Sequence, residues 1–120
     1  MSMISIVEIP TEDFSRAMAF YRKILNIDIE VVEMEGIKMG LFPGTGEISV
    51  QLLKADGYTP SSEGTIVYLN GGDDLQQIAA RIDGNGGRLV VPKTEIGQDM
   101  GFYAMFIDTE GNRLGLHSPH

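Results

Sequence analysis

An internal repeat restricts the possible folds of this sequence more than any other feature. A strand-like run at residues 65–69 lies sixty residues after a similar run at residues 5–9. A helix-like pattern follows each run, and the apolar positions of the second lie sixty-one residues after those of the first. These positions are Phe14, Ala17, Met18 and Tyr21, then Leu75, Ile78, Ala79 and Ile82. An insertion in the loop at residues 70–72 explains the one-residue difference, and we expect two copies of one module.

Each copy reads as a strand, a helix and three further strands. Thr11 or Asp13 can cap the first helix, and Asn26 can end it in a left-handed conformation. The strands predicted after the helices cover residues 29–34, 37–42, 48–53, 88–91, 102–107 and 113–117. The sequence thus predicts an α+β fold of two βαβββ modules within a single domain at residues 1–120. Module 1 spans about residues 3–54, a linker 55–63 and module 2 64–118.

Composition and charge narrow the classes of partner. Nine Lys and Arg residues against seventeen Asp and Glu residues give a net charge of −8, which repels nucleic acid and anionic lipid. Cysteine is absent, so disulfides, thiolate metal sites and a cysteine nucleophile are excluded. No segment approaches the roughly 18 apolar residues of a membrane span, and the first ten residues lack a basic, apolar leader pattern. We expect a cytoplasmic protein with no nucleic-acid or membrane partner.

Several motifs together resemble the vicinal oxygen chelate superfamily, which includes glyoxalase I, the bleomycin-resistance proteins and the extradiol dioxygenases. They are Asp13, Arg16-Ala17 and Phe20-Tyr21 on the first helix, and Asp108-Thr109-Glu110-Gly111-Asn112 between the last two strands. The resemblance covers nearly the whole chain, and residues 8–10 and 115–118 are similar to an uncharacterised, glyoxalase-like bacterial branch. It implies that the two modules share a concave cavity for a small molecule. It also favours a homodimer, as do the open edges of small sheets.

The resemblance further implies four metal-ligand positions, two in each module, occupied by His, Glu or Gln. Counting back fourteen residues from Phe20 places the first ligand at Ile6. The matching position in module 2 is Ile66, or Thr65 or Val67 if the register shifts by one.

The last-strand position, where the family pattern has Glu, is Gly115, and Gln51 is the only nearby fourth-strand candidate with a ligating oxygen. A catalytic divalent ion generally needs three or more protein ligands. We therefore predict no metal and no other cofactor.

Two polar residues lie next to the vacant ligand positions and are the candidate catalytic residues. Strand alternation places Glu8 on the face of Ile6, and His117 on the face of Gly115. Each has a simpler explanation, because a lone histidine at a strand end is most often a surface residue. A strand carboxylate can also be paired or solvated, since its burial without a partner costs several kcal/mol.

The candidate ligand-binding residues lie on the same strands or on their neighbours: Gln51, Tyr68, Tyr103 and Met105. Tyr68 occupies the position in module 2 that Glu8 occupies in module 1. Met34, Met39 and Met100 can add adaptable pocket walls, although methionines are more often core residues. His120 is expected to be a mobile tail.

Three functions are compatible with this pattern. The first is a metal-free module that binds a small molecule, analogous to the bleomycin-resistance proteins. The second is a lyase or isomerase in which Glu8 and His117 act as base and acid on a small carbonyl or enol substrate. The third keeps a divalent metal at relocated ligands, namely Glu8, His117 and Gln51. Loss of the usual ligands favours the first.

Overall fold

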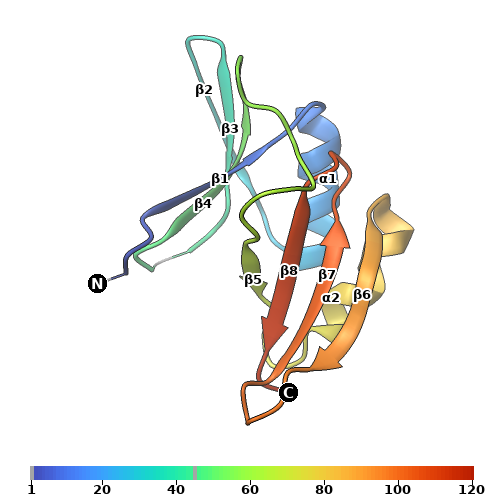
Figure 1. Cartoon of the computed structure of the whole chain (residues 1–120). Coiled ribbons are helices and arrows are strands. Elements are labelled where there is room, and N and C mark those ends of the chain that lie inside the picture. The colour runs from blue at the N-terminus through green and yellow to red at the C-terminus, as the bar shows by residue number, and fades with distance from the viewer. Residues whose placement is uncertain (1, 45) are drawn as a thin grey trace. The chain divides into compact units, whose positions relative to one another are not determined.

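The computed structural model describes residues 2–44 and 46–120, and the chain divides into two compact units, Met1–Pro60 and Ser61–His120 (Figure 1). The division falls inside the predicted linker. Each unit contains one four-stranded mixed sheet, as the repeat predicts. None of the helices formed by the described residues is long and apolar enough to cross a membrane.

The first unit follows the predicted order of a strand, a helix and three strands. Its elements are β1 (Ile6–Pro10), α1 (Phe14–Leu25), β2 (Glu30–Met34), β3 (Ile37–Leu41) and β4 (Ser49–Lys54). The spatial order is β1-β4-β3-β2, in which β1 runs parallel to β4 and the other pairs are antiparallel. Parallel pairing of β1 with β4 brings the first and last strands of the module together.

Helix α1 begins and ends as its sequence predicts. The Asp13 side chain accepts a hydrogen bond of 3.0 Å from the backbone N–H of Arg16, and Asn26 ends the helix with φ of 54°. The apolar side of the helix, including Phe14 and Met18, is buried. At Gly40 of β3, an added Cβ would lie 2.8 Å from Met18 Sδ. The absence of a side chain there lets the sheet approach the helix closely.

The second unit repeats this topology. Its elements are β5 (Tyr68–Asn70), α2 (Gln76–Ile82), the 3₁₀ turn η1 (Asp83–Asn85), β6 (Arg88–Glu95), β7 (Phe102–Ile107) and β8 (Arg113–Ser118). The spatial order is β5-β8-β7-β6, with β5 parallel to β8. Leu75, Ala79 and Ile82 are buried, and Ile78 is half-buried. The predicted repeat of strands and helices is therefore confirmed.

Two predicted strands differ from the observed ones by more than one residue at an end. The strand predicted at 65–69 is the shorter β5, although the Val67 carbonyl still accepts a hydrogen bond from the Gly115 N–H. The strand predicted at 88–91 continues through Pro92 to Glu95 as β6. Strand β6 lies at the sheet edge and its register with β7 shifts twice, so a residue without an N–H is tolerated there.

The last strand also completes the start of α2. Ser118 of β8 is fully buried, and its hydroxyl accepts a hydrogen bond of 2.9 Å from the Leu75 N–H. The backbone N–H of His120 donates to the Asp73 carbonyl at 3.2 Å, and the Ser118 hydroxyl donates to the His120 carbonyl. The expectation that His120 is a mobile tail was wrong, because these bonds tie it to the loop before α2.

Candidate functional site

The face of the second sheet opposite α2 carries most of the polar and aromatic candidates. Along β8, Leu114, Leu116 and Ser118 are buried, while Gly115 and His117 alternate onto the other face. The strand register sets Tyr68 and Met105 beside Gly115, and Asn70 and Tyr103 beside His117. Directly paired residues share a sheet face, so these side chains belong to one surface of the unit.

An aromatic ring lies over the glycine of this surface. A Cβ added at Gly115 would overlap the ring carbons of Tyr68, a residue that is 50% exposed. The ring therefore occupies the space into which a side chain at position 115 would project. This is the position at which the family pattern has Glu.

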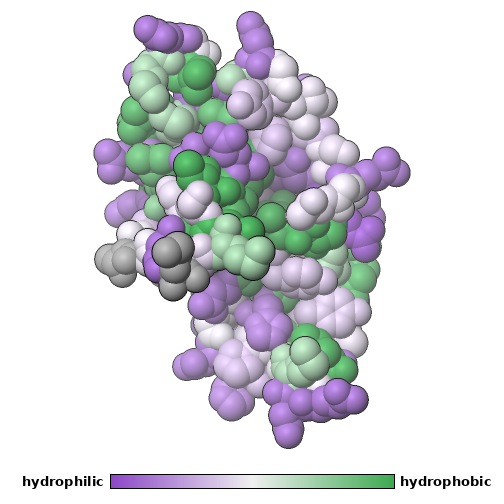
Figure 2. Space-filling view, turned by 60° about the vertical axis from the view of Figure 1, so that its left-hand side comes forward, coloured by the Kyte–Doolittle hydropathy of each residue, from purple (hydrophilic) through white to green (hydrophobic). Residues whose placement is uncertain are grey.

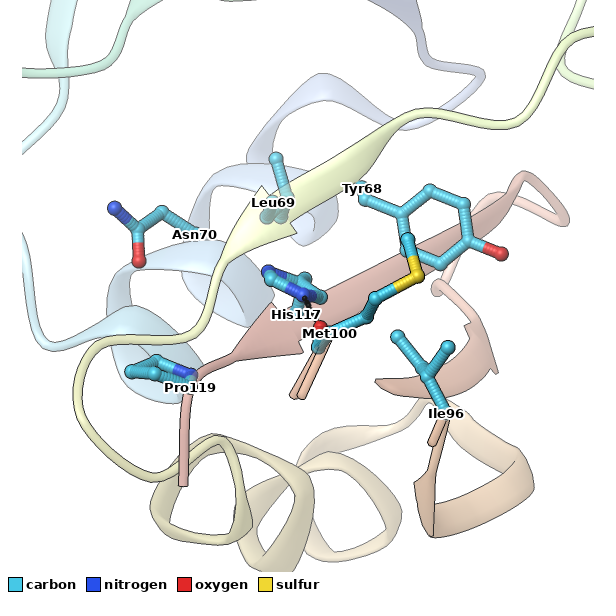
Figure 3. Close-up of a pocket in the computed structure, with 7 residues that line it drawn as sticks. All are labelled: Tyr68, Leu69, Asn70, Ile96, Met100, His117 and Pro119. Atoms are coloured by element: carbon cyan, nitrogen blue, oxygen red, sulfur yellow. Dashed lines mark hydrogen bonds between the residues drawn. The ribbon is translucent and has the colours of Figure 1, made fainter. Parts of the chain in front are cut away.

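Beside this ring lies an open pocket of about 640 Å³ (Figure 3). The residues that line it are Tyr68, Leu69, Asn70, Ile96, Met100, His117 and Pro119. His117 Nε2 lies 2.8 Å from the Met100 carbonyl oxygen, and a carbonyl can only accept, so Nε2 carries the proton. Tyr103 is half-buried and Met105 is buried, and neither lines the pocket.

The loop between β6 and β7 supplies two of the pocket walls, Ile96 and Met100. Left-handed φ angles occur at Gly97, Gln98, Asp99 and Gly101, and the two non-glycine values are 52° and 58°. Such conformations cost roughly 1–3 kcal/mol at a non-glycine residue and need support from their surroundings. The support includes hydrogen bonds from the Ile96 N–H to the Gly101 carbonyl at 2.9 Å and from the Met100 N–H to the Gly97 carbonyl at 3.0 Å.

Sequence reasoning missed the pocket residues Leu69, Asn70, Ile96 and Pro119. Two of them follow from features that the sequence does show. The Gly97 and Gly101 pair marks a tight connection between two strands, and such a connection can carry its flanking residues over a sheet face. Pro119 follows the last strand directly, beside the predicted candidate His117.

The first unit carries a different pair at the equivalent place on its open face. Glu8 of β1 and Gln51 of β4 are register partners, and Gln51 Nε2 donates to Glu8 Oε2 at 3.2 Å. The same amide nitrogen lies 3.6 Å from Met39 Sδ. Gln51 is buried and Glu8 is exposed. The Glu8 carboxylate is thus both partnered and accessible to solvent.

Comparison with known proteins now defines the family. The model of the Glyoxalase/Bleomycin resistance protein/Dioxygenase superfamily matches residues 3–116. The chain belongs to this superfamily. No curated protein matches the sequence.

Several solved structures share the fold of this chain at low sequence identity. TnmS3, an antibiotic binding protein from a Streptomyces species, is 22% identical, with a TM-score of 0.68 over 100% of this chain and 98% of that one. FosX, a fosfomycin resistance protein from Listeria monocytogenes, is 18% identical, with a TM-score of 0.72 and coverage of 98% and 93%.

Glyoxalase I from Zea mays is also 18% identical, with a TM-score of 0.75 over 96% of this chain. The match covers 45% of the maize chain, so this protein spans less than half the length of that relative. At these identities the likeness shows the fold alone.

The positions at which the resemblance predicts metal ligands hold few ligating atoms. The side chains of Ile6 and Gly115 have no atom that can ligate a metal ion, and Gln51 directs its amide nitrogen to Glu8. Within residues 2–44 and 46–120, no group of three or more His, Cys, Asp or Glu side chains is placed to hold a metal ion. That Glu8 and His117 face a common cavity stays a prediction, since they belong to different units.

Proposed function

We propose that this superfamily member binds an organic small molecule in the pocket beside Tyr68, without the divalent metal that the family pattern implies. The observation that carries the proposal is the placement of the Tyr68 ring over Gly115. At position 115, where the family pattern has a metal-ligating glutamate, this chain therefore presents an apolar aromatic surface.

The chemistry of the pocket supports binding over metal-assisted catalysis. A catalytic metal needs about three protein ligands, and the family positions Ile6 and Gly115 supply none. The pocket walls are mostly apolar, and His117 is the one imidazole among them. Pockets of this composition hold ligands through buried apolar contact and a few oriented polar groups.

The printed functions of two structural relatives point in the same direction. TnmS3 is described as an antibiotic binding protein and FosX as a fosfomycin resistance protein. Both are associated with small organic molecules. The proposal also includes a cytoplasmic bacterial protein that forms a homodimer, because each open sheet has edges that proteins usually cover or pair.

The test combines metal analysis with ligand binding. We expect purified protein grown with added Zn²⁺ and Mn²⁺ to contain far less than one metal ion per chain, measured by plasma mass spectrometry. We expect EDTA to leave the thermal midpoint unchanged, and small organic ligands of the pocket to raise it, because a ligand that binds only the folded state stabilises it.

The control variants are Glu8→Gln and His117→Ala. A metal ion present at one per chain in the native protein and lost in either variant would overturn the metal-free proposal. That result would establish the relocated site at Glu8, His117 and Gln51 instead.

A further inference from the structure

Three large apolar side chains gather at one small region of the second unit. Tyr68 is 50%, Met100 59% and Ile96 42% exposed, and all three line the pocket. Figure 2 shows that exposed apolar groups on the visible face lie among many polar ones. In the view of Figure 3 the Met100 thioether overlaps the Tyr68 ring, and Ile96 is drawn below them. Because all three line one pocket, an apolar molecule held there can contact each of them.

The polar group of the pocket is oriented by the chain itself. In Figure 3 one ring nitrogen of His117 turns toward Met100 and the other turns away from it. Because Nε2 donates to the Met100 carbonyl, the neutral ring presents Nδ1 as a hydrogen-bond acceptor. Nδ1 has no hydrogen-bond partner within the described part of the chain. A ligand that carries a hydrogen-bond donor can therefore pair with this nitrogen.

The remaining pocket residues argue against an anionic ligand. The pocket lining contains no lysine or arginine, and the chain carries a net charge of −8. Asn70 directs its side-chain oxygen to the Gly72 N–H at 2.9 Å, so this oxygen is already engaged. A carboxylate or phosphate would find no fixed cation here, whereas a neutral hydroxyl matches the free acceptor.

We infer that the pocket takes a flat aromatic molecule that bears a hydroxyl group. The aromatic ring lies against Tyr68 and Met100, and the hydroxyl donates to His117 Nδ1. Offset stacking on a tyrosine and contact with a thioether both favour an aromatic ligand over an aliphatic one. This inference rests on the proposed function and adds the chemical class of the ligand.

Three naphthalene compounds separate these contributions. 2-Naphthol carries a donor, 2-methoxynaphthalene has the same ring without a donor, and 2-naphthoate carries a negative charge. We expect 2-naphthol to bind the native protein about three- to tenfold more tightly than 2-methoxynaphthalene, because one hydrogen bond is gained. We expect 2-naphthoate to bind the least tightly. Isothermal titration calorimetry measures all three affinities.

The His117→Gln variant isolates the acceptor. A glutamine amide can still donate to the Met100 carbonyl from near the position of Nε2, and its only acceptor, Oε1, does not occupy the position of Nδ1. We expect this variant to bind both neutral compounds with equal affinity, while Tyr68→Leu weakens both. His120→Gln is the matched control, because His120 is the other histidine and does not line the pocket. We expect it to leave both affinities unchanged.

Each contrary result has a separate meaning. Equal affinities of the native protein for 2-naphthol and 2-methoxynaphthalene would overturn the hydroxyl assignment but leave the pocket as a binding site. If 2-naphthoate binds most tightly, the hydroxyl assignment is overturned, and a positively charged His117 that attracts the carboxylate replaces it. If none of the three binds, the aromatic class is overturned. The proposed function is then judged separately, by metal content and by thermal shifts with non-aromatic compounds.

Discussion

The two sheets have the same strand order but carry different chemistry at the same register position. In the first unit, the pair across the parallel strands is Glu8 and Gln51, joined by a hydrogen bond of 3.2 Å. In the second unit it is Tyr68 and Gly115, where a ring covers a glycine. The first face thus offers an exposed carboxylate, and the second offers an aromatic surface.

On the helix-facing side, the same strands carry buried apolar residues in both units. Ile9 and Leu52 in the first unit are 3% and 0% exposed, and Leu69 and Leu116 in the second are 9% and 0% exposed. These residues are also register partners across β1–β4 and β5–β8. The comparison teaches that burial under the helix maintains the fold, while the opposite face is free to change its function.

The largest expected difference between the helix-facing and the open face is in the stability lost when a glycine is replaced by alanine. We expect Gly40→Ala to lower the free energy of unfolding by about 1–3 kcal/mol, because the methyl group would overpack the core against Met18. Gly115→Ala should cost less than about 1 kcal/mol, since the half-exposed Tyr68 ring can swing aside, but it should weaken 2-naphthol binding. Urea unfolding and calorimetry measure the two effects. Equal losses of stability would show that Tyr68 is held as firmly as the core.

A smaller difference in stability is expected when the cap at the start of each helix is removed. Ser118→Ala should lower the free energy of unfolding by about 1–2 kcal/mol, because it leaves the N–H of Leu75 without its buried acceptor. Asp13→Ala should cost about 1 kcal/mol or less, since water can replace a cap at an exposed helix start. Urea unfolding of both variants checks the order. A larger loss for Asp13→Ala would contradict it.

The smallest expected effect concerns the pH dependence of stability and arises at Asp74 of the second unit. The hydrogen bond from Lys93 to Asp74, at 2.8 Å, holds the pKa of Asp74 below its usual value of 3.8, and a bond from the Gln76 N–H acts in the same direction. A pKa lowered by folding stabilises the protein above pH of about 4, and this contribution is lost as the pH falls further.

Asp74→Asn should therefore be less stable than the native protein at pH 7, and the two should converge in acid. Thermal unfolding between about pH 2 and 7 measures the difference, with the exposed neighbour variant Asp73→Asn as control. The effect is small because the Asp74 side chain is 44% exposed, so that solvent screens its charge. A constant difference across this range would exclude the Asp74 carboxylate as its source.

Much of the fold could be predicted because local signals and the repeat agree. Helix α1 has a cap at Asp13 and a left-handed stop at Asn26, and both act over a few residues. The bounds of β6 were harder, because a proline usually ends a strand. Whether Pro92 ends this one depends on its place at the sheet edge, which is a property of the tertiary structure.

The site was less accessible to sequence reasoning than the fold. Alternation along β8 correctly set His117 on the face opposite Leu116, because the period of a strand is fixed. Ile96 and Met100 enter the pocket through four left-handed residues, and no periodicity describes such a path. The hydrogen bond that orients His117 also comes from this loop.

The hydrogen bond from the Leu75 N–H to the Ser118 hydroxyl affects the order in which the two units can fold during synthesis. Helix α1 is completed by its neighbours in sequence, but α2 has seven residues and receives its buried cap from a residue 43 positions later. A helix this short is unstable alone in water. On the ribosome the first unit can acquire its helix early, whereas α2 must wait until β8 has been made. The Leu75 amide should remain open to hydrogen exchange until that strand docks.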